Sequence, residues 1–297
     1  MKRRDLLGAL AAGVALGGPV GQRASGPLDP ILDAAPGPLA HLPTGRLKQS
    51  VSRWPYSGIP LPDFARQCKG IGLVAIDLLQ PEEWKVVQDA GLACSMGYPS
   101  ARRDFLGTGF NDTANHAMLL GELEKSIPQA KAAGVTNVIT MFGNRRGKSD
   151  AEGAANSIAG LKKIAPLAEE QGVTLHVELL NSKVDHKDYQ GDRTAWGVEV
   201  MKGVGSPNVK LLYDIYHMQI MEGDIIRTIR DNIQYLGHFH TGGVPGRNEL
   251  DATQELNWNA IAKAIADLGF QGYVAHEFMP TGDPMTSLKE AYETMKV

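Results

Sequence analysis

The sequence is poor in cysteine, and its two cysteines, Cys68 and Cys94, lack the short spacing of a metal-binding or redox pair. Cys68 is expected on a helix and Cys94 on a strand, both as buried apolar thiols. A disulfide between them is the less favoured alternative, because it requires the two backbones to approach closely.

An excess of positive charge is also missing. The chain has 30 basic against 33 acidic residues, and no basic run follows the N-terminal segment. Proteins that bind nucleic acid present clustered Lys and Arg to the phosphate backbone, so no nucleic-acid partner is expected. Hydrophobic residues make up 43% of the chain, which is ordinary for a globular protein with a sizeable core.

No apolar run reaches the roughly 20 residues of a membrane-spanning helix. The longest, from Leu6 to Gly18, follows the pair Arg3-Arg4, which is the layout of a twin-arginine export signal. We therefore expect an export signal over residues 1–25, a Pro- and Gly-rich linker over 26–45 and a folded domain over 46–297. The mature protein is expected in the periplasm and not inserted in a membrane. A short membrane anchor is the alternative.

No glycine fingerprint follows the first strand-like run, which disfavours a Rossmann fold. From residue 46, eight β-rich runs alternate with amphipathic helix-like segments, and Gly91, Gly134 and Gly269 stand where helix C-termini are expected. This order predicts an α/β fold, a single (β/α)8 TIM barrel. The expected strands are 47–52, 73–78, 92–96, 137–142, 174–178, 209–214, 235–240 and 272–277, and the clearest expected helices are 61–70, 81–91, 113–133, 150–171 and 256–269.

Four residues with metal-binding side chains stand at the ends of the last four expected strands: Glu178, Asp214, His240 and Glu277. In a barrel, the carboxyl ends of the strands carry the chemistry. Three oxygen donors and one nitrogen suit one divalent ion, Mg, Mn, Co or Zn. Taken singly, Glu178 could be a surface residue and Asp214 a helix cap. The joint pattern favours the metal site.

Two further residues stand on the expected strands. His238 stands two residues before His240, and we expect the two rings to point to opposite faces, one of them as a hydrogen-bonded core histidine. Asp77 ends the second expected strand and is a weak candidate for a group that supports the metal ligands.

The second half of the chain resembles the xylose-isomerase-like barrels, and among them most closely the hydroxypyruvate isomerases. The resemblance is carried by VELLN at 177–181, SPNVKLLYDIYHMQIMEGD at 206–224, VPGRNE at 244–249, ELNW at 255–258 and GYVAHEFMP at 272–280. It implies that Glu178, Asp214, His240 and Glu277 hold the metal. Glu178 and Glu277 would also act as the acid/base pair.

One position departs from the pattern. Typical hydroxypyruvate isomerases carry glutamine where this chain has His240. In having a histidine at this position, the chain is similar to the ketose 3-epimerases. The reaction class is the same for both: a proton leaves a carbon beside a carbonyl, and a metal and two carboxylates stabilise and reprotonate the enediolate. Conversion of hydroxypyruvate to tartronate semialdehyde is the preferred reaction. The alternatives are a ketose 3-epimerase, a keto-sugar epimerase or lyase, and a metal-stabilised binding protein without turnover.

Three further residues are candidates for substrate binding. His217 follows the sixth strand and is expected to donate to a substrate oxygen, the alternative being a residue that starts the next helix. Arg247 follows Pro245 and Gly246 and is expected to pair with a substrate carboxylate, oriented by Glu249. Asn181 is expected to fix the loop after Glu178 or to touch the substrate.

Other predictions concern the surroundings of the site. Trp54 and Tyr56 are expected to form an apolar wall, and NSKVDHKDY at 181–189 a lid or a solvated loop. GTGFND at 107–112 lacks a P-loop lysine and is not expected to bind phosphate. The first half offers only His41 and His116 away from strand ends, which disfavours the multi-metal endonucleases of this barrel type. The expected partner is a small keto acid or sugar. Barrels of this kind often pair, so a homodimer stays open.

Overall fold

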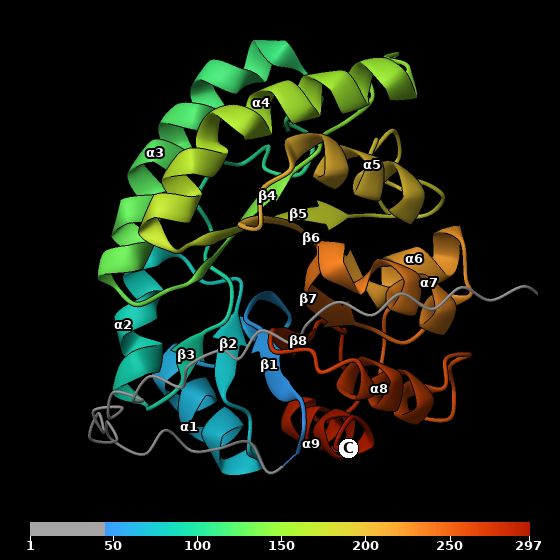
Figure 1. The fold of residues 1–297 in the computed structure, drawn as a ribbon. Coiled ribbons are helices and arrows are strands. Elements are labelled where there is room, and N and C mark those ends of the chain that lie inside the picture. The colour runs from blue at the N-terminus through green and yellow to red at the C-terminus, as the bar shows by residue number, and fades with distance from the viewer. Residues whose placement is uncertain (1–44) are drawn as a thin grey trace, which may run out of the picture. The chain divides into compact units, whose positions relative to one another are not determined.

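The computed structural model of the protein describes residues 45–297 (Figure 1). The predicted export signal, nearly all of the predicted linker and His41 therefore lie outside the described residues. Within the described part of the chain, no helix combines the length and the apolar character needed to cross a membrane.

The described residues form eight parallel strands that alternate with helices along the chain. The sheet has the order β3-β2-β1-β8-β7-β6-β5-β4. The (β/α)8 barrel predicted from the sequence is confirmed, with every strand within three residues of its expected bounds. The strands are β1 (Lys48–Ser52), β2 (Ala75–Asp77), β3 (Ala93–Cys94), β4 (Asn137–Met141), β5 (Thr174–Leu179), β6 (Val209–Asp214), β7 (Leu236–Thr241) and β8 (Tyr273–His276).

Gly97 joins the two ends of this sheet. Its backbone N–H donates to the carbonyl of Asn137 over 2.9 Å, and its carbonyl accepts from the N–H of Ile139 over 3.1 Å. These bonds pair the segment after β3 with β4, so the ring of strands is continuous although β3 itself has only two residues. A Cβ at position 97 would lie 2.9 Å from the ring of Trp84, which explains why glycine stands there.

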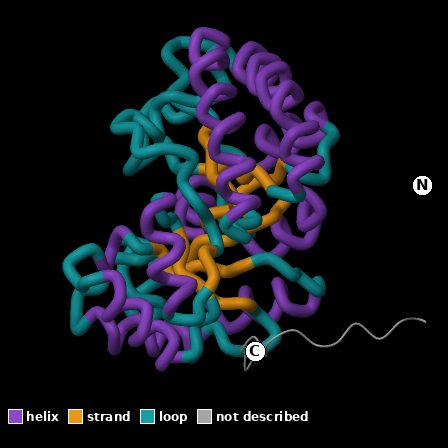
Figure 2. Tube along the Cα trace, turned by 90° about the vertical axis from the view of Figure 1, so that its left-hand side faces the viewer, coloured by secondary structure: helices purple, strands orange, loops and turns teal. Residues whose placement is uncertain are grey.

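The helices surround the strands on the outside, as the tube in Figure 2 shows. The helix predicted at 150–171 matches α4 at both ends, because the Ser149 side chain caps its first turn and Gly172 ends it in the left-handed region. Two helices, α6 and α7, stand between β6 and β7 where one was expected. The α-helices are α1 (Leu61–Ile71), α2 (Pro81–Asp89), α3 (His116–Ala132), α4 (Asp150–Gln171), α5 (Thr194–Val204), α6 (Ile215–Met221), α7 (Ile225–Asn232), α8 (Trp258–Asp267) and α9 (Pro284–Thr294).

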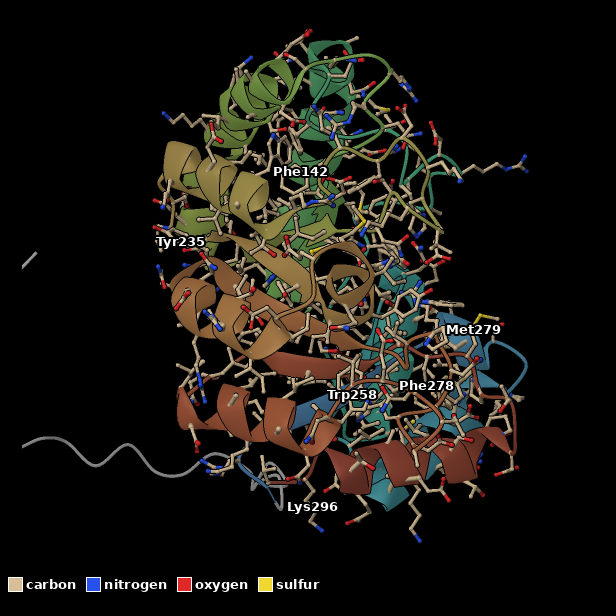
Figure 3. All side chains as sticks on the ribbon, turned by 90° about the vertical axis from the view of Figure 1, so that its right-hand side faces the viewer. Phe142, Tyr235, Trp258, Phe278, Met279 and Lys296 are labelled. Atoms are coloured by element: carbon tan, nitrogen blue, oxygen red, sulfur yellow. The ribbon has the colours of Figure 1, made fainter. Side chains whose placement is uncertain are left out.

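Apolar side chains fill the layer between strands and helices, whereas much of the inside of the barrel is polar. Cys68 and Cys94 are both buried and free, as expected. After β8, Glu277 and Phe278 are both buried, and Met279 is 52% exposed at the edge of the molecule (Figure 3).

Buried neutral histidines make the stability of this barrel dependent on pH. His276 is fully buried, its Nε2 is 2.9 Å from Gln49 Oε1, and its Nδ1 is 3.1 Å from Thr241 Oγ1. Burial lowers the pKa of His276 from 6.5 to about 3. The unfolded chain therefore binds a proton between these pH values that the folded protein does not bind. We expect the stability to be highest above pH 6.5 and to fall as the pH decreases towards 3.

Urea unfolding at several pH values between 4.5 and 7 measures this effect. His276 alone contributes a loss of up to about 1.4 kcal/mol per pH unit below 6.5. In the variant His276→Gln the slope should be smaller by that amount, even if the variant is less stable at every pH. An unchanged slope would show that His276 is protonated in the folded protein.

Candidate functional site

The four predicted metal ligands meet at the carboxyl ends of β5 to β8. Glu178, Asp214, His240 and Glu277 are all buried, and one candidate ligand atom from each lies within 4.8 Å of all the others. Asp214 and His240 are register partners on β6 and β7. Glu277 follows β8 directly, and its N–H donates to the Thr241 carbonyl over 2.9 Å, which extends the pairing with β7 by one residue. The strand ends thus bring together residues that are up to 99 positions apart.

His240 faces the three carboxylates with one ring nitrogen only. Its Nδ1 is 2.7 Å from Glu277 Oε2, 3.3 Å from Glu178 Oε1 and 3.9 Å from Asp214 Oδ2. Its Nε2 lies 2.9 Å from Asp77 Oδ2 on the opposite side of the ring. The expectation that Asp77 supports the metal ligands therefore agrees with its position.

The expectation that His238 and His240 point to opposite faces is wrong. Side chains alternate along a strand, so residues two apart share a face. Both rings point into the barrel, and their centroids are 5.2 Å apart. His238 Nε2 lies 3.1 Å from the second oxygen of Asp77. His238 is thus a buried core histidine, and its ring contacts the same carboxylate as His240.

Asp214 serves as a helix cap and as a member of the cluster at the same time. Its Oδ1 accepts from the N–H of His217 over 3.2 Å, which caps α6, and its Oδ2 faces His240 and Arg247. The two interpretations considered from the sequence are therefore compatible. His217 is not in a loop but in the first turn of α6, where this cap holds it against the cluster.

Arg247 pairs with two carboxylates of the cluster. Its Nη2 is 2.6 Å from Glu277 Oε2 and 3.1 Å from Asp214 Oδ2. The residue has φ 57°, in the left-handed region, and its backbone is held by Gly243 and Met279. Glu249 does not orient it as expected: the Glu249 carboxylate accepts from Thr281 and from residues 282 and 287 instead, which fixes the loop after β8.

The charges of the cluster shift one another. The pKa of the Asp214 carboxyl is raised to about 7, mainly by burial and in addition by Glu277, although Arg247 opposes this shift. Burial would also raise the pKa of Glu277, but His240 and Arg247 lower it below its usual range. Burial would lower the pKa of His240, yet the surrounding carboxylates raise it well above its usual value. The cluster therefore attracts positive charge at its centre.

His217 presents a fixed N–H to the pocket. The Asn181 side-chain oxygen accepts from the backbone N–H groups of Val184 and Asp185, so its amide nitrogen must be the group that donates to His217 Nδ1 over 2.6 Å. Burial lowers the pKa of His217 well below its usual range, and Arg247 lowers it further, so the ring is neutral. The single ring proton is then on Nε2, which has no hydrogen-bond partner in the described structure and lies 3.5 Å from Asp214 Oδ2.

The stretch 181–189 is anchored to the barrel at several points. Tyr189 donates to the Glu178 carbonyl over 2.9 Å, and Lys183 donates to the carbonyls that end α6. Between these anchors His186 lines the pocket, with its ring 5.2 Å from that of His217. Asn181 fixes this stretch, as one of its two predicted roles required.

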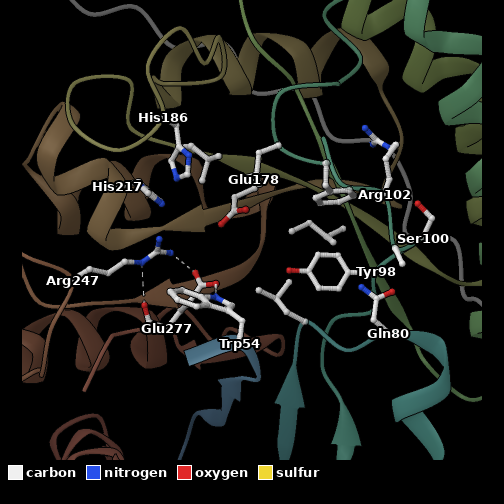
Figure 4. A pocket seen from close by; sticks show the side chains of 16 residues that line it. Trp54, Gln80, Tyr98, Ser100, Arg102, Glu178, His186, His217, Arg247 and Glu277 are labelled. Atoms are coloured by element: carbon white, nitrogen blue, oxygen red, sulfur yellow. Dashed lines mark hydrogen bonds and ion pairs between the residues drawn. The ribbon is translucent and has the colours of Figure 1, made fainter. Parts of the chain in front are cut away.

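A pocket of about 520 Å³ opens above the cluster (Figure 4). Trp54 lines it as expected and donates from Nε1 to Glu277 Oε1 over 2.5 Å. Tyr56 does not: it is buried in the core, where it stacks on Phe64. Tyr98 also lines the pocket and was not predicted, because its sequence signal is merely an aromatic residue just after an expected strand. The remaining lining residues are Leu78, Gln80, Ser100, Ala101, Arg102, Phe105, Leu106, Ile139, Glu178, Leu180, His186, His217, Arg247 and Glu277.

The four-residue cluster fits a divalent cation. Three buried carboxylates within 4.8 Å of one another repel unless a cation is shared between them, and Arg247 approaches only two of them. The buried His240 Nδ1 points at the same three groups and has no well-aligned hydrogen bond. Oxygen donors with one imidazole nitrogen are suited to Mg, Mn, Co or Zn.

The family follows from comparison with known proteins. The model of the xylose isomerase-like TIM barrel family matches residues 44–296. The chain belongs to this family. Relatives of the chain are named as isomerases and epimerases, and this relationship identifies the chain as an isomerase.

Individual relatives are similar to this chain at modest sequence identity. A human putative hydroxypyruvate isomerase is 27% identical over 240 residues, covering 79% of this chain and 80% of the relative. A D-psicose 3-epimerase of Ruminiclostridium cellulolyticum is 36% identical over 125 residues, covering 41% and 40%. The crystal structure of a family 2 AP endonuclease from Brucella melitensis superposes with a TM-score of 0.74 at 20% identity, covering 82% of this chain and 97% of that one. The last likeness concerns the fold alone.

Proposed function

We propose that the protein is a metal-dependent isomerase that moves a proton between adjacent carbons of an α-hydroxycarbonyl compound. The observation that carries this proposal is the meeting of Glu178, Asp214, His240 and Glu277 at the floor of a pocket that Glu178 and Glu277 also line. These four residues would hold a divalent ion, which would supply Lewis acidity towards the oxygens of a bound carbonyl compound. The preferred reaction converts hydroxypyruvate to tartronate semialdehyde.

Glu178 and Glu277 are the groups that exchange protons with the substrate. One carboxylate takes the proton from carbon, and the other returns a proton to the neighbouring carbon or to the opposite face. Glu277 is held for this role by Trp54 on one oxygen and by Arg247 on the other. Glu178 has fewer partners, which leaves its carboxylate the freer of the two to approach the substrate.

His217 stabilises the oxygen on which negative charge develops. Its neutral ring presents Nε2–H towards the pocket, and Asn181 maintains this tautomer. A fixed donor in a buried site stabilises a developing oxyanion more than a mobile donor would, because it does not have to reorganise during the reaction.

A keto-sugar epimerase is the second candidate, favoured by the size and lining of the pocket. Hydroxypyruvate has seven non-hydrogen atoms and displaces only about four waters, roughly 100 Å³, whereas the pocket measures about 520 Å³. Its outer wall is apolar and aromatic, with Tyr98 and Phe105 in edge contact at 5.3 Å. Such a wall suits the carbon face of a larger sugar.

A substrate panel tests the proposal and separates the two candidates. Protein reloaded with Mn or Mg is offered hydroxypyruvate, D-fructose, D-tagatose and a 3-keto-glucoside, and products are identified by NMR. Aldehyde formation from hydroxypyruvate supports the preferred reaction, and epimerisation of a sugar alone supports the second candidate. Failure with all four, in protein that binds the metal, would contradict the proposed function and favour a binding protein.

Arg247 should discriminate between the same candidates. If it pairs with a substrate carboxylate, Arg247→Lys loses the two-pronged contact and raises KM for hydroxypyruvate about 10- to 100-fold, on the scale of one charged hydrogen bond. The KM for a neutral ketose should change much less. Steady-state kinetics of both substrates measure the difference, and equal changes in KM would show that Arg247 serves only the cluster.

The N-terminal segment bears on where the enzyme acts. With Arg3-Arg4 before an apolar stretch, we propose that the enzyme is exported and acts in the periplasm on small keto compounds that reach it there.

A further inference from the structure

We infer that Asp77 is a positioning residue for the metal: it fixes the tautomer and the orientation of His240, so that His240 Nδ1 faces the cation. The inference rests on the metal site of the proposed function. Asp77 comes from β2, in the half of the chain that contributes no residue to the four-residue cluster.

The two ring nitrogens of His240 have different surroundings. Nδ1 faces Glu178, Asp214 and Glu277, whereas Nε2 lies 2.9 Å from Asp77 Oδ2. A metal ion binds the unprotonated nitrogen of a neutral imidazole. The proton must therefore be on Nε2, and a carboxylate at hydrogen-bond distance is the partner that holds it there.

Asp77 is itself held in place through its other oxygen. Ser95 Oγ donates to Asp77 Oδ1 over 2.6 Å, and His238 Nε2 lies 3.1 Å from the same oxygen. Oδ2 is left for His240. Asp77 is fully buried, so its carboxylate is held by these groups of the protein.

The backbone also restricts where the Asp77 carboxylate can lie. Asp77 is the register partner of Ser52 at the end of β2. The next residue, Leu78, has φ 54°, a left-handed conformation that is rare for leucine and that turns its side chain into the pocket lining. Strain of this kind is retained where neighbouring groups must be held in a defined place.

Asp77, His238 and His240 could instead be interpreted as a second metal site, because their ligand atoms also lie close together. The hydrogen bonds already made by Asp77 argue against this. His240 Nε2 lies at hydrogen-bond distance, 2.9 Å, from Asp77 Oδ2, and Ser95 Oγ donates to Oδ1 over 2.6 Å, while His238 Nε2 lies 3.1 Å from that oxygen. Both oxygens of Asp77 therefore have protein donors without an ion.

Metal affinity tests the inference. The affinity for Mn²⁺ is measured by electron paramagnetic resonance of the free ion, for wild type, Asp77→Ala and the matched control Ser95→Ala. Ser95→Ala removes a buried contact of the same carboxylate but leaves Oδ2 on His240. We expect Asp77→Ala to bind Mn²⁺ about 10- to 100-fold more weakly, and Ser95→Ala to stay within about threefold of wild type.

A measurement on the wild-type protein is independent of whether the variant folds. In zinc-loaded protein with ¹⁵N-histidine, His240 should show a protonated Nε2 with a far-downfield proton and an unprotonated Nδ1. The signal is assigned by its absence in His240→Gln. A proton on Nδ1, or equal Mn²⁺ affinity of folded Asp77→Ala and wild type, overturns the inference. Equal weakening by Ser95→Ala would also overturn it, because the effect would then be general loss of packing.

The outcome also separates this inference from the proposed function. If wild type binds Mn²⁺ and Asp77→Ala binds it equally well, only the role of Asp77 is wrong. If the wild type binds no divalent metal, the metal-dependent function and the role of Asp77 both fail.

Discussion

Replacing Glu178 or Glu277 by glutamine is expected to lower kcat by about 10²- to 10⁴-fold, the usual contribution of a positioned acid or base. An amide keeps the shape of the side chain and an oxygen that can contact a metal, but it cannot take a proton from carbon. Some metal should therefore stay bound while turnover disappears. Steady-state kinetics and the metal content of the same samples measure the two effects separately.

Glu255→Gln is the matched control for these variants. Glu255 is exposed, accepts a hydrogen bond from Gln219, and is not among the residues that line the pocket of the cluster. Its replacement makes the same chemical change and should leave kcat within about twofold. Turnover retained by both Glu178→Gln and Glu277→Gln would remove the acid/base pair from the mechanism.

Removing the metal is expected to abolish turnover and to destabilise the protein together. Without the cation, Arg247 and His240 are the charged partners that the described residues offer the three carboxylates of the cluster. A ligand present at 100 times its Kd stabilises the folded protein by about 2.7 kcal/mol. Dialysis against a chelator should therefore lower Tm by several degrees, and addition of Mn or Mg should restore both Tm and activity.

Asp214→Asn distinguishes metal binding at this cluster from binding elsewhere. The asparagine oxygen can still cap α6, but the cluster loses one negative charge. We expect a smaller rise of Tm on addition of metal than in wild type. Full activity in the presence of chelator, with no change of Tm, would contradict the metal-dependent account.

The strands and the four-residue cluster were predictable because they depend on local patterns. Glu178, Asp214 and Glu277 each follow a short apolar run, and parallel strands in one barrel bring their carboxyl ends together. Residue type and position along the strand were enough to place them. The family motifs then indicated which chemistry such a group performs.

The partners of these residues were not predictable, since they depend on distances across the barrel. Nothing in the sequence pairs Asp77 with His240, 163 positions later, and the wrong expectation for His238 concealed the shared carboxylate. The contact of Arg247 with Glu277 and the failure of Glu249 to reach it depend on the conformation of a loop. Loop conformation also brings Tyr98 into the pocket and leaves Tyr56 in the core.

Exchange of substrate hydrogen with solvent deuterium tests the central claim most directly. Wild-type protein loaded with Mn or Mg, and the same protein with chelator, are incubated in deuterated water with hydroxypyruvate and with a ketose, and NMR follows deuterium at the carbon beside the carbonyl. The account predicts exchange that requires the metal and is lost in Glu178→Gln and Glu277→Gln. Metal-loaded protein that incorporates no deuterium into either substrate above the protein-free control would contradict it.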